Sequence, residues 1–365
     1  MVYKVIGIMS GSSLDGLDIA YTYLEEIRGK WTFDLKEAAC IEYTDEWKHD
    51  LKNVAKKNVP DFLKLHTHYG KYIAERINHF IDQHNLHHQV HFISSHGHTV
   101  FHEPQNGTTC QIGDGATIAA ITGLPVISDL RMLDVALGGQ GAPIVPIGDH
   151  LLFGDNDYWL NIGGIANITV KQNEKMMAFD VCPANQVLNI LAQRNDLEMD
   201  ENGNIAASGA LLSDVLVQLN EQDYYRQNAP KSLSNEAAIQ LVFPSLLESE
   251  HATEDLMHTA VYHIAEQVAN AVEKYPINKE STKMLVTGGG AFNSFLVMQL
   301  ERELTKYNVQ LVIPDNKTVK FKEALVMALI GALRWREETN VLSSVTGASK
   351  DSISGAIYMG HTYAD

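Results

Sequence analysis

The chain contains few cysteines and no long apolar segment. Its three cysteines, Cys40, Cys110 and Cys182, are far apart and lack metal-ligand spacing. This usage is typical of a reducing compartment rather than of a disulfide framework. No window approaches the roughly 18 apolar residues that span a bilayer, and the apolar run before Ser10 has no basic lead typical of a secretory signal. We therefore expect a cytoplasmic protein.

Basic residues are also scarce. Lys and Arg together number 28 against 45 Asp and Glu, which gives a net charge of −17. Because an acidic surface repels phosphate backbones and anionic lipids, nucleic acid and membrane partners are not expected. A small phosphorylated ligand needs only a local group of donors, so it is not excluded.

Two common nucleotide-binding motifs are missing. The sequence has neither the Gly-x-x-x-x-Gly-Lys-Ser/Thr motif nor a Gly-x-Gly-x-x-Gly motif that opens a crossover helix. A P-loop enzyme and a Rossmann enzyme are therefore disfavoured.

A repeated order of elements stands in their place. A strand, a glycine turn, two further strands and a helix occur from about residue 3 and again from about residue 158. With 365 residues, this pattern predicts two duplicated α/β domains joined by short segments, with ligands in a cleft between them. We place the first domain at 1–130 with about 350–365, and the second at 131–349.

Apolar periodicity and turn residues predict the individual elements. The expected strands are 3–9, 17–24, 31–43, 90–95, 125–130, the hairpin 159–170, 176–181, 284–286 and 309–314. The expected helices are 62–81, 116–122, 184–193, 293–306 and 321–335, and 209–275 is expected to be mainly helical.

Three glycine-rich turns each follow a predicted strand: Gly7–Asp18, Asn161–Asn167 and Thr287–Asn293. Small residues let the backbone approach a polyphosphate, and a helix start adds N–H donors. Tight turns with capping carboxylates, or close strand–helix packing, are the structural alternatives, but three such turns favour nucleotide binding. The predicted nucleotide-binding residues are Gly11, Ser12, Ser13, Leu14, Asp15, Gly16, Leu17, Asp18, Gly163, Gly164, Asn167, Gly288, Gly289, Gly290 and Asn293. Magnesium would be held through the ATP phosphates and by Asp15 or Asp18.

Phrases spread over nearly the whole chain carry a resemblance to a known family. They include the first glycine turn, Ser95–Val100, Gln111–Gly115, Ala136–Pro146, Asn161–Thr169 and Ser344–Ala348. In these phrases the chain resembles the anhydro-N-acetylmuramic acid kinase family of the actin, sugar-kinase and heat-shock ATPase superfamily. The resemblance implies two actin-like, ribonuclease H-like domains.

The resemblance also implies a reaction. Its members use ATP and magnesium to phosphorylate the 6-oxygen of a 1,6-anhydro sugar while water opens the ring at the anomeric carbon. The expected product is N-acetylmuramic acid 6-phosphate, in cell-wall sugar recycling. A homodimer is kept open as a further expectation.

By resemblance the catalytic base is Asp180, which ends a strand directly before a helix. A helix-capping carboxylate is the structural alternative. The surrounding phrase departs from the family pattern. Val181, Cys182, Ala184 and Asn189 replace the usual Thr, Gly, Gly and Asp, whereas Asp180, Pro183 and Asn185 remain. These changes leave the sugar's identity and the turnover open, and Cys182 is expected to be a small buried filler.

The resemblance implies four substrate-binding residues: His96, Arg131, Asn185 and Glu323. Arg131 would pair with the lactyl carboxylate, with a domain-bridging salt bridge as the alternative. Glu323 would otherwise stabilise a helix start, and His96 would otherwise satisfy a buried backbone group.

Other functions stay open at this point. An ATP-independent glycoside hydrolase would use Asp180 and Glu323 as its carboxylate pair. A catalytically silent ATP-binding sensor and a kinase for a different anhydro sugar are further alternatives. The eight histidines from His79 to His102 lack zinc-ligand spacing, so we interpret them as a polar surface segment plus one cleft histidine rather than a metal site.

Overall fold

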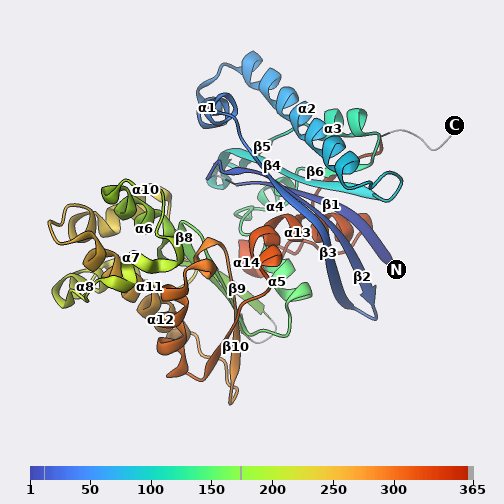
Figure 1. Cartoon of the computed structure of the whole chain (residues 1–365). Helices are drawn as coiled ribbons and strands as arrows, with labels where there is room; N and C mark the ends of the chain where they lie inside the picture. Colours follow the sequence, from blue (N-terminus) through green and yellow to red (C-terminus); the bar gives the residue numbers. More distant parts are fainter. Residues whose placement is uncertain (12, 173–174, 361–365) are drawn as a thin grey trace. The chain divides into compact units, whose positions relative to one another are not determined.

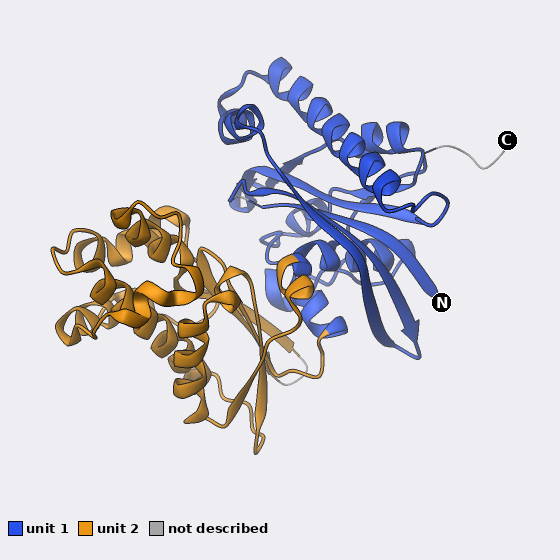
Figure 2. Ribbon diagram, viewed as in Figure 1, with its two compact units in different colours: residues 1–152, 321–365 blue, residues 153–320 orange. Residues whose placement is uncertain are grey.

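The chain forms two compact units (Figures 1 and 2), in a computed structural model that describes residues 1–11, 13–172 and 175–360. Unit 1 comprises residues 1–152 and 321–365, and unit 2 comprises residues 153–320. These limits differ from the domain boundaries predicted near residues 130 and 350. The reason is packing: a Cβ on Gly7 would lie 1.9 Å from the backbone oxygen of Ala324, so the last long helix belongs against the first strand.

Unit 1 is built around a mixed sheet that, within the described residues, has seven strands in the order β12-β6-β4-β1-β2-β3, with β5 paired to β4. Its strands are β1 Val2–Ser10, β2 Gly16–Ile27, β3 Lys30–Glu42, β4 Phe92–Glu103, β5 Thr108–Ile112, β6 Val126–Ser128 and β12 Ala356–Tyr358. Its helices are α1 Asp45–Asn53, α2 Val59–Gln83, α3 Gly115–Thr122, α4 Met132–Ala136, α5 Pro146–Leu152, α14 Ser343–Thr346 and, from residue 321 on, α13 Asn316–Trp335.

Alternation along β1 explains how this sheet is covered. Ile6 and Ile8 pack into one cluster with Ile73 and Ile77 of α2, whereas Gly7 between them faces α13. The helix α2 begins where Asn58 accepts a hydrogen bond from the backbone N–H of Asp61. The long helix predicted at 62–81 is therefore confirmed. With α2 against one face of the sheet and α13 against the other, helices cover both faces.

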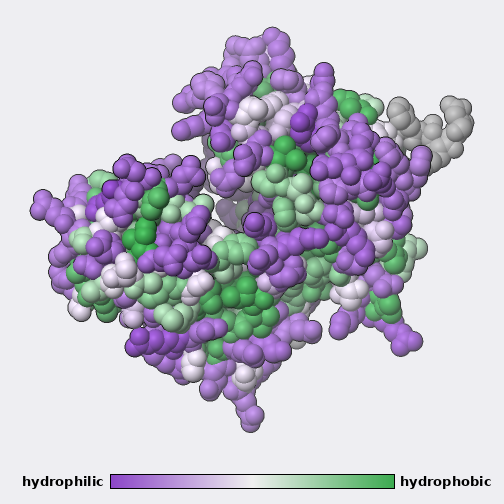
Figure 3. Space-filling view, in the orientation of Figure 1, coloured by the Kyte–Doolittle hydropathy of each residue, from purple (hydrophilic) through white to green (hydrophobic). Residues whose placement is uncertain are grey.

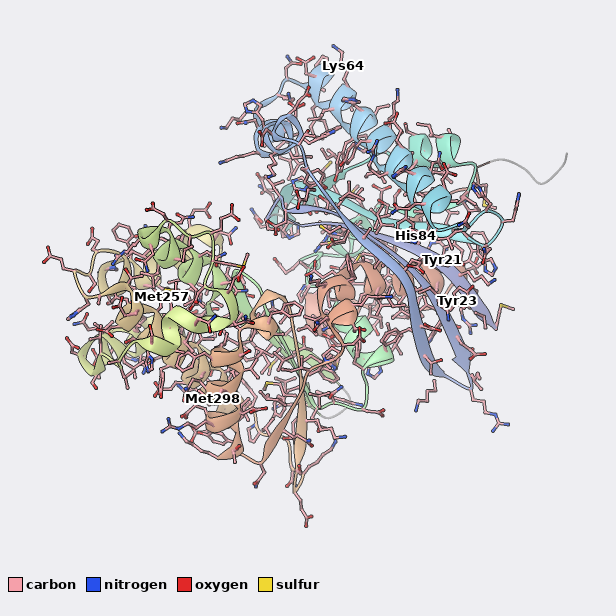
Figure 4. The ribbon with its side chains drawn as sticks, viewed as in Figure 1. Tyr21, Tyr23, Lys64, His84, Met257 and Met298 are labelled. Atoms are coloured by element: carbon pink, nitrogen blue, oxygen red, sulfur yellow. The ribbon has the colours of Figure 1, made fainter. Side chains whose placement is uncertain are left out.

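Unit 2 has a sheet of five strands within the described residues, in the order β11-β10-β7-β8-β9. Its strands are β7 Tyr158–Ile162, β8 Ile165–Gln172, β9 Lys175–Pro183, β10 Thr282–Thr287 and β11 Val309–Val312. Its helices are α6 Asn185–Ala192, α7 Asn204–Ser208, α8 Ser213–Asn220, α9 Asp223–Arg226, α10 Asn235–Val242, α11 Thr253–Lys274 and α12 Ser294–Thr305. In α11 Met257 is fully buried, whereas Met298 of α12 is half-exposed (Figure 4).

The two sheets share one topology. An antiparallel meander of three strands, β1-β2-β3 or β7-β8-β9, is followed by a strand parallel to its first member, β4 or β10, and then by another parallel strand, β6 or β11. The duplicated α/β fold of two actin-like domains is thereby confirmed.

Short elements escaped the sequence analysis. The helix α1 and the strands β5 and β12 were not predicted, because segments of three to nine residues are too short to show a clear period. On the visible face of the molecule hydrophilic residues predominate (Figure 3). Among the described residues, no helix is both long and apolar enough to cross a bilayer.

Candidate active-site residues

The second and third glycine turns meet at the start of α6. The backbone N–H groups of Ala184 and Asn185 donate to the carbonyl oxygens of Gly164 and Gly163 over 2.8 and 3.1 Å. The side-chain amide of Asn185 donates to the Ile162 oxygen over 3.0 Å. A Cβ on Gly289 or Gly290, in the short helix η6 Gly289–Phe292, would lie 3.3 Å from the Asn185 amide. Two of the three turns that the sequence analysis grouped, the second and the third, therefore lie together.

Not all of these glycines are required by packing. A Cβ on Gly290 would lie 2.3 Å from the Ile162 side chain, and Gly288 has φ +82° with Ile162 directly behind it. At Gly163 and Gly164 the nearest atoms would be 3.7 and 3.5 Å away, which is ordinary contact. The internal structure thus accounts for Gly288 and Gly290 but not for Gly163 and Gly164. Bare backbone at the latter positions is what a close-approaching phosphate requires.

A row of polar residues crosses the sheet of unit 2. Thr287 of β10 pairs with Asn161 of β7, Asn161 with Asn167 of β8, and Asn167 with Asp180 of β9. Directly paired residues project from the same face of a sheet. Asn167, predicted as a nucleotide ligand, thus neighbours the predicted base, and Asn161 joins them although it was not predicted. Its symmetric place in the hairpin Asn161–Asn167 was the available clue.

Asp180 is held by the segment that runs along the edge of β9. Its Oδ2 accepts a hydrogen bond from the Leu233 N–H over 2.8 Å, and its carbonyl accepts one from the Tyr224 hydroxyl over 2.8 Å. Burial raises the pKa of Asp180 above its ordinary value, and the Leu233 N–H and the Lys231 ammonium partly offset this effect. The helix α6 has no side-chain cap at Ala184, so the helix-cap alternative for Asp180 is wrong.

Two further residues of unit 2, Asn293 and Cys182, have structural roles. Asn293 caps α12, because its Oδ1 accepts a hydrogen bond from the Leu296 N–H over 2.9 Å. A nucleotide contact through this oxygen stays a prediction. Cys182 is fully buried in the core of unit 2, which confirms its role as a small filler.

The first glycine turn, in unit 1, combines exposed residues with residues that are buried in strand β2. Ser12 lies outside the described residues, whereas Ser13 and Asp15 are exposed and Leu14 has φ +61°. Gly16 and Leu17 already belong to β2. Leu17 is fully buried, and a Cβ on Gly16 would lie 2.7 Å from the Cys40 sulfur. Any ligand contact by Leu17 would therefore use its backbone.

Carboxylates gather near this turn. Burial, together with the charges of Glu323 and Asp15, raises the pKa of Asp18 to about 6, against a hydrogen bond with Cys40 that lowers it. Burial also raises the pKa of Glu323, partly offset by Arg131 and Lys322. Carboxylate oxygens that repel one another suit a hard cation such as magnesium. Within the described residues, no group of three or more His, Cys, Asp and Glu forms a complete metal-ligand set.

His96 orients Arg131. The Nδ1–H of His96 donates to the Gly97 carbonyl over 2.9 Å, so the Nε2 is left to accept from the Arg131 Nε over 2.7 Å. Burial and the Arg131 charge lower the pKa of His96 to about 3, which keeps the ring neutral. Both ring nitrogens are engaged, so a direct sugar contact through either of them stays a prediction. The interpretation that His96 satisfies a buried backbone group is confirmed.

Asp134 is a buried residue that the sequence analysis missed. Its Oδ2 accepts from the Gly141 N–H and its Oδ1 from the Thr346 hydroxyl, each over 2.7 Å. The Gly141 carbonyl in turn accepts from the Arg131 guanidinium over 2.8 Å. Asp134 thus joins the phrases Ala136–Pro146 and Ser344–Ala348, and only the fold reveals that both converge on Arg131.

Known proteins are similar to this chain over nearly its whole length. The family model for Anhydro-N-acetylmuramic acid kinase matches residues 3–360. An anhydro-N-acetylmuramic acid kinase from Bacillus thuringiensis (strain Al Hakam) is 30% identical, with 98% of each chain covered. A dehydratase activator from Clostridium difficile with bound ADPNP gives a TM-score of 0.45 at 16% identity, over 92% of this chain and 96% of that one. A glucokinase of the ROK family from Streptomyces griseus, in complex with glucose and AMPPNP, gives a TM-score of 0.40 at 12% identity, over 90% of this chain and 99% of that one.

The family match covers nearly the whole chain. The chain belongs to the anhydro-N-acetylmuramic acid kinase family and is a sugar kinase.

Proposed function

We propose that this kinase opens the 1,6-anhydro ring of anhydro-N-acetylmuramic acid with water and transfers the γ-phosphoryl group of ATP to the 6-oxygen. The water oxygen bonds to the anomeric carbon, the bond from that carbon to the 6-oxygen breaks, and the 6-oxygen attacks phosphorus. The products are N-acetylmuramic acid 6-phosphate and ADP, and the proton of the water passes to Asp180. The observation that carries this proposal is the row that places Asp180 in register with Asn167 and Asn161.

The environment of Asp180 supports its role as the base. Its Oδ2 is anchored by one backbone N–H, and burial raises its pKa, so the carboxylate is a better proton acceptor than an exposed one. Gly163, Gly164 and Gly289 would receive the phosphates on backbone donors, with Asn185 holding both turns in place.

Unit 1 would supply the charged groups. Arg131 is oriented by His96 and Gly141 and would pair with the lactyl carboxylate of the sugar. Asp15 or Asp18, together with the ATP phosphates, would hold magnesium, which offsets the charge of the phosphates when bound. Burial and the charges of Glu323 and Asp15 raise the pKa of Asp18, and a cation bound there would relieve this repulsion.

The ligand cleft expected between the two domains remains a prediction. So do the cytoplasmic location and the homodimer.

Product mass tests the reaction. The protein is incubated with anhydro-N-acetylmuramic acid, ATP and magnesium in ¹⁸O-labelled water. We expect a product heavier than the substrate by one phosphoryl group and one water, with the label at the anomeric carbon. An unlabelled, still-anhydro phosphate would contradict ring opening. Ring opening without ATP would favour the hydrolase alternative, and the absence of any product would favour the ATP-binding sensor.

A further inference from the structure

Unit 2 contains a cavity that the proposed reaction does not use. It has a volume of about 390 Å³, within the range of small-ligand pockets, and lies between β9, the segment 225–231 and the last turns of α11. None of its lining residues belongs to the glycine turns. The cavity is therefore distinct from the residues proposed to bind phosphate.

The rim of this cavity is cationic. Arg226, Lys231 and Lys274 line it together with the single carboxylate of Glu273, in a chain whose net charge is −17. Arg226 forms an exposed ion pair with Asp223, and Lys274 donates to the carbonyl oxygens of residues 226 and 227. An excess of positive charge in so acidic a protein favours an anionic ligand.

Lys231 is the best-placed of the three cations. It is half-buried, its ammonium donates to the Tyr224 carbonyl over 3.0 Å, and it lies 4.2 Å from the centre of the Tyr224 ring. Burial, reinforced by the charge of Lys274, lowers the pKa of Lys231 to about 8. An anion beside this ammonium would offset both effects.

The floor of the cavity is apolar. Phe179 and Val181 of β9 and Ala271 of α11 are buried there, and the Phe179 and Tyr275 rings lie 5.2 Å apart. We propose that the cavity binds a small organic anion, with an apolar body against Phe179 and Ala271 and a carboxylate or phosphate group on Lys231.

The wall of this cavity is connected to Asp180. The Asp180 N–H donates to the Lys231 carbonyl over 3.1 Å, and two residues later the Leu233 N–H donates to the Asp180 carboxylate. Tyr224, whose ring faces the Lys231 ammonium, also donates to the Asp180 carbonyl. Occupation of the cavity therefore changes the surroundings of this carboxylate. This second step rests on the proposed role of Asp180, whereas the binding step does not.

Calorimetric titration of the full chain with phenyl phosphate tests the binding. A saturating ATP analogue is present throughout to fill the nucleotide site. We expect saturable binding of phenyl phosphate and no binding of the neutral phenyl glucoside. Weaker binding of benzoate would show that the cavity prefers a phosphate to a carboxylate group. Lys231→Met should weaken binding by about ten- to a hundred-fold, the value of a charge-assisted hydrogen bond. Ala271→Phe, which fills the cavity, should abolish it.

The exposed Lys175, at the start of β9, provides the matched control for Lys231→Met. Lys175→Met should bind phenyl phosphate as the wild type does. Equal binding of the neutral glucoside would overturn the assignment of an anion. The absence of binding, or unchanged binding by both cavity variants, would overturn the site itself. Phenyl phosphate should also shift the acid limb of the pH–rate profile. Binding without that shift would overturn only the coupling to Asp180.

Discussion

The two units share a strand order but present different chemistry at corresponding ends of their sheets. In unit 2 the strand ends carry bare backbone at Gly163, Gly164 and Gly289 beside a single carboxylate, Asp180. In unit 1 the corresponding region carries ionisable side chains, Asp18, Arg131 and Glu323, whose pKa values are shifted by burial and by neighbouring charges. A duplicated fold thus provides one unit with backbone donors and the other with charges. The substitutions below test that division, from the largest expected effect to the smallest.

Asp180→Asn should cause the largest loss. Asn keeps an oxygen for the Leu233 N–H, so the fold should persist, but it cannot accept the proton of the attacking water. We expect sugar phosphorylation to fall by about 10²- to 10⁴-fold with nucleotide affinity unchanged. In the wild type, activity should fall as pH drops through the raised pKa of Asp180, because a base must be ionised to act.

The exposed Asp214 of α8 supplies the control, and Asp214→Asn should retain full activity. A general base typically contributes at least about a hundred-fold to the rate. If Asp180→Asn keeps more than about a tenth of the activity, Asp180 is therefore not the base.

A pair of adjacent glycines separates ligand binding from packing. Gly289→Ala meets only the Asn185 amide at 3.3 Å, so it should leave the melting temperature nearly unchanged but weaken binding of an ATP analogue by about tenfold or more. Gly290→Ala collides with Ile162 and should destabilise the fold by about 1–3 kcal/mol through overpacking. Calorimetry and thermal unfolding of both variants measure this. Unchanged nucleotide affinity in Gly289→Ala would assign the third turn a structural role.

Asp134→Asn should act on unit 1 through Arg131. An amide replaces one carboxylate oxygen with a donor, so either the Gly141 N–H or the Thr346 hydroxyl loses its acceptor. We expect the KM for the sugar to rise by about ten-fold, the value of one hydrogen bond to a charged group, with a smaller change in kcat. Thr346→Val, which removes only the hydroxyl, should give a weaker effect in the same direction. A lower melting temperature with an unchanged KM would show that Asp134 is merely structural.

Asp18→Asn should have the smallest effect, and it should raise the stability of the fold rather than lower it. Because its pKa is raised to about 6 in the folded protein, the ionised form costs stability as pH rises above the ordinary value of 3.8. The variant should therefore melt about 1–3 °C above the wild type at about pH 8, and the difference should vanish below about pH 4. Magnesium should stabilise only the wild type. A variant less stable at the higher pH would contradict the raised pKa.

Local patterns in the sequence determined much of the fold. The periodicity of α2 and α13 and the glycine-bounded hairpins identified most long elements, because burial of one face leaves a period that can be read directly. The repeated order of these elements predicted the duplication that the two sheets confirm. The limits of the two units differ from the expected domain boundaries, since helix α13 packs against Gly7, which lies far from it along the chain.

The tertiary structure alone decided which polar residues lie together. Asn161, Asn167 and Asp180 become neighbours through strand register, and a bulge between Ala166 and Asn167 sets that register. Asp134 and Thr346 are separated by 212 positions in sequence, yet they share one hydrogen bond in the interior of unit 1. Sequence motifs report backbone needs and local periods, whereas long-range hydrogen bonds depend on how the chain folds back on itself. The sequence could therefore propose Arg131 and Asp180 as candidates, but not the groups that hold them.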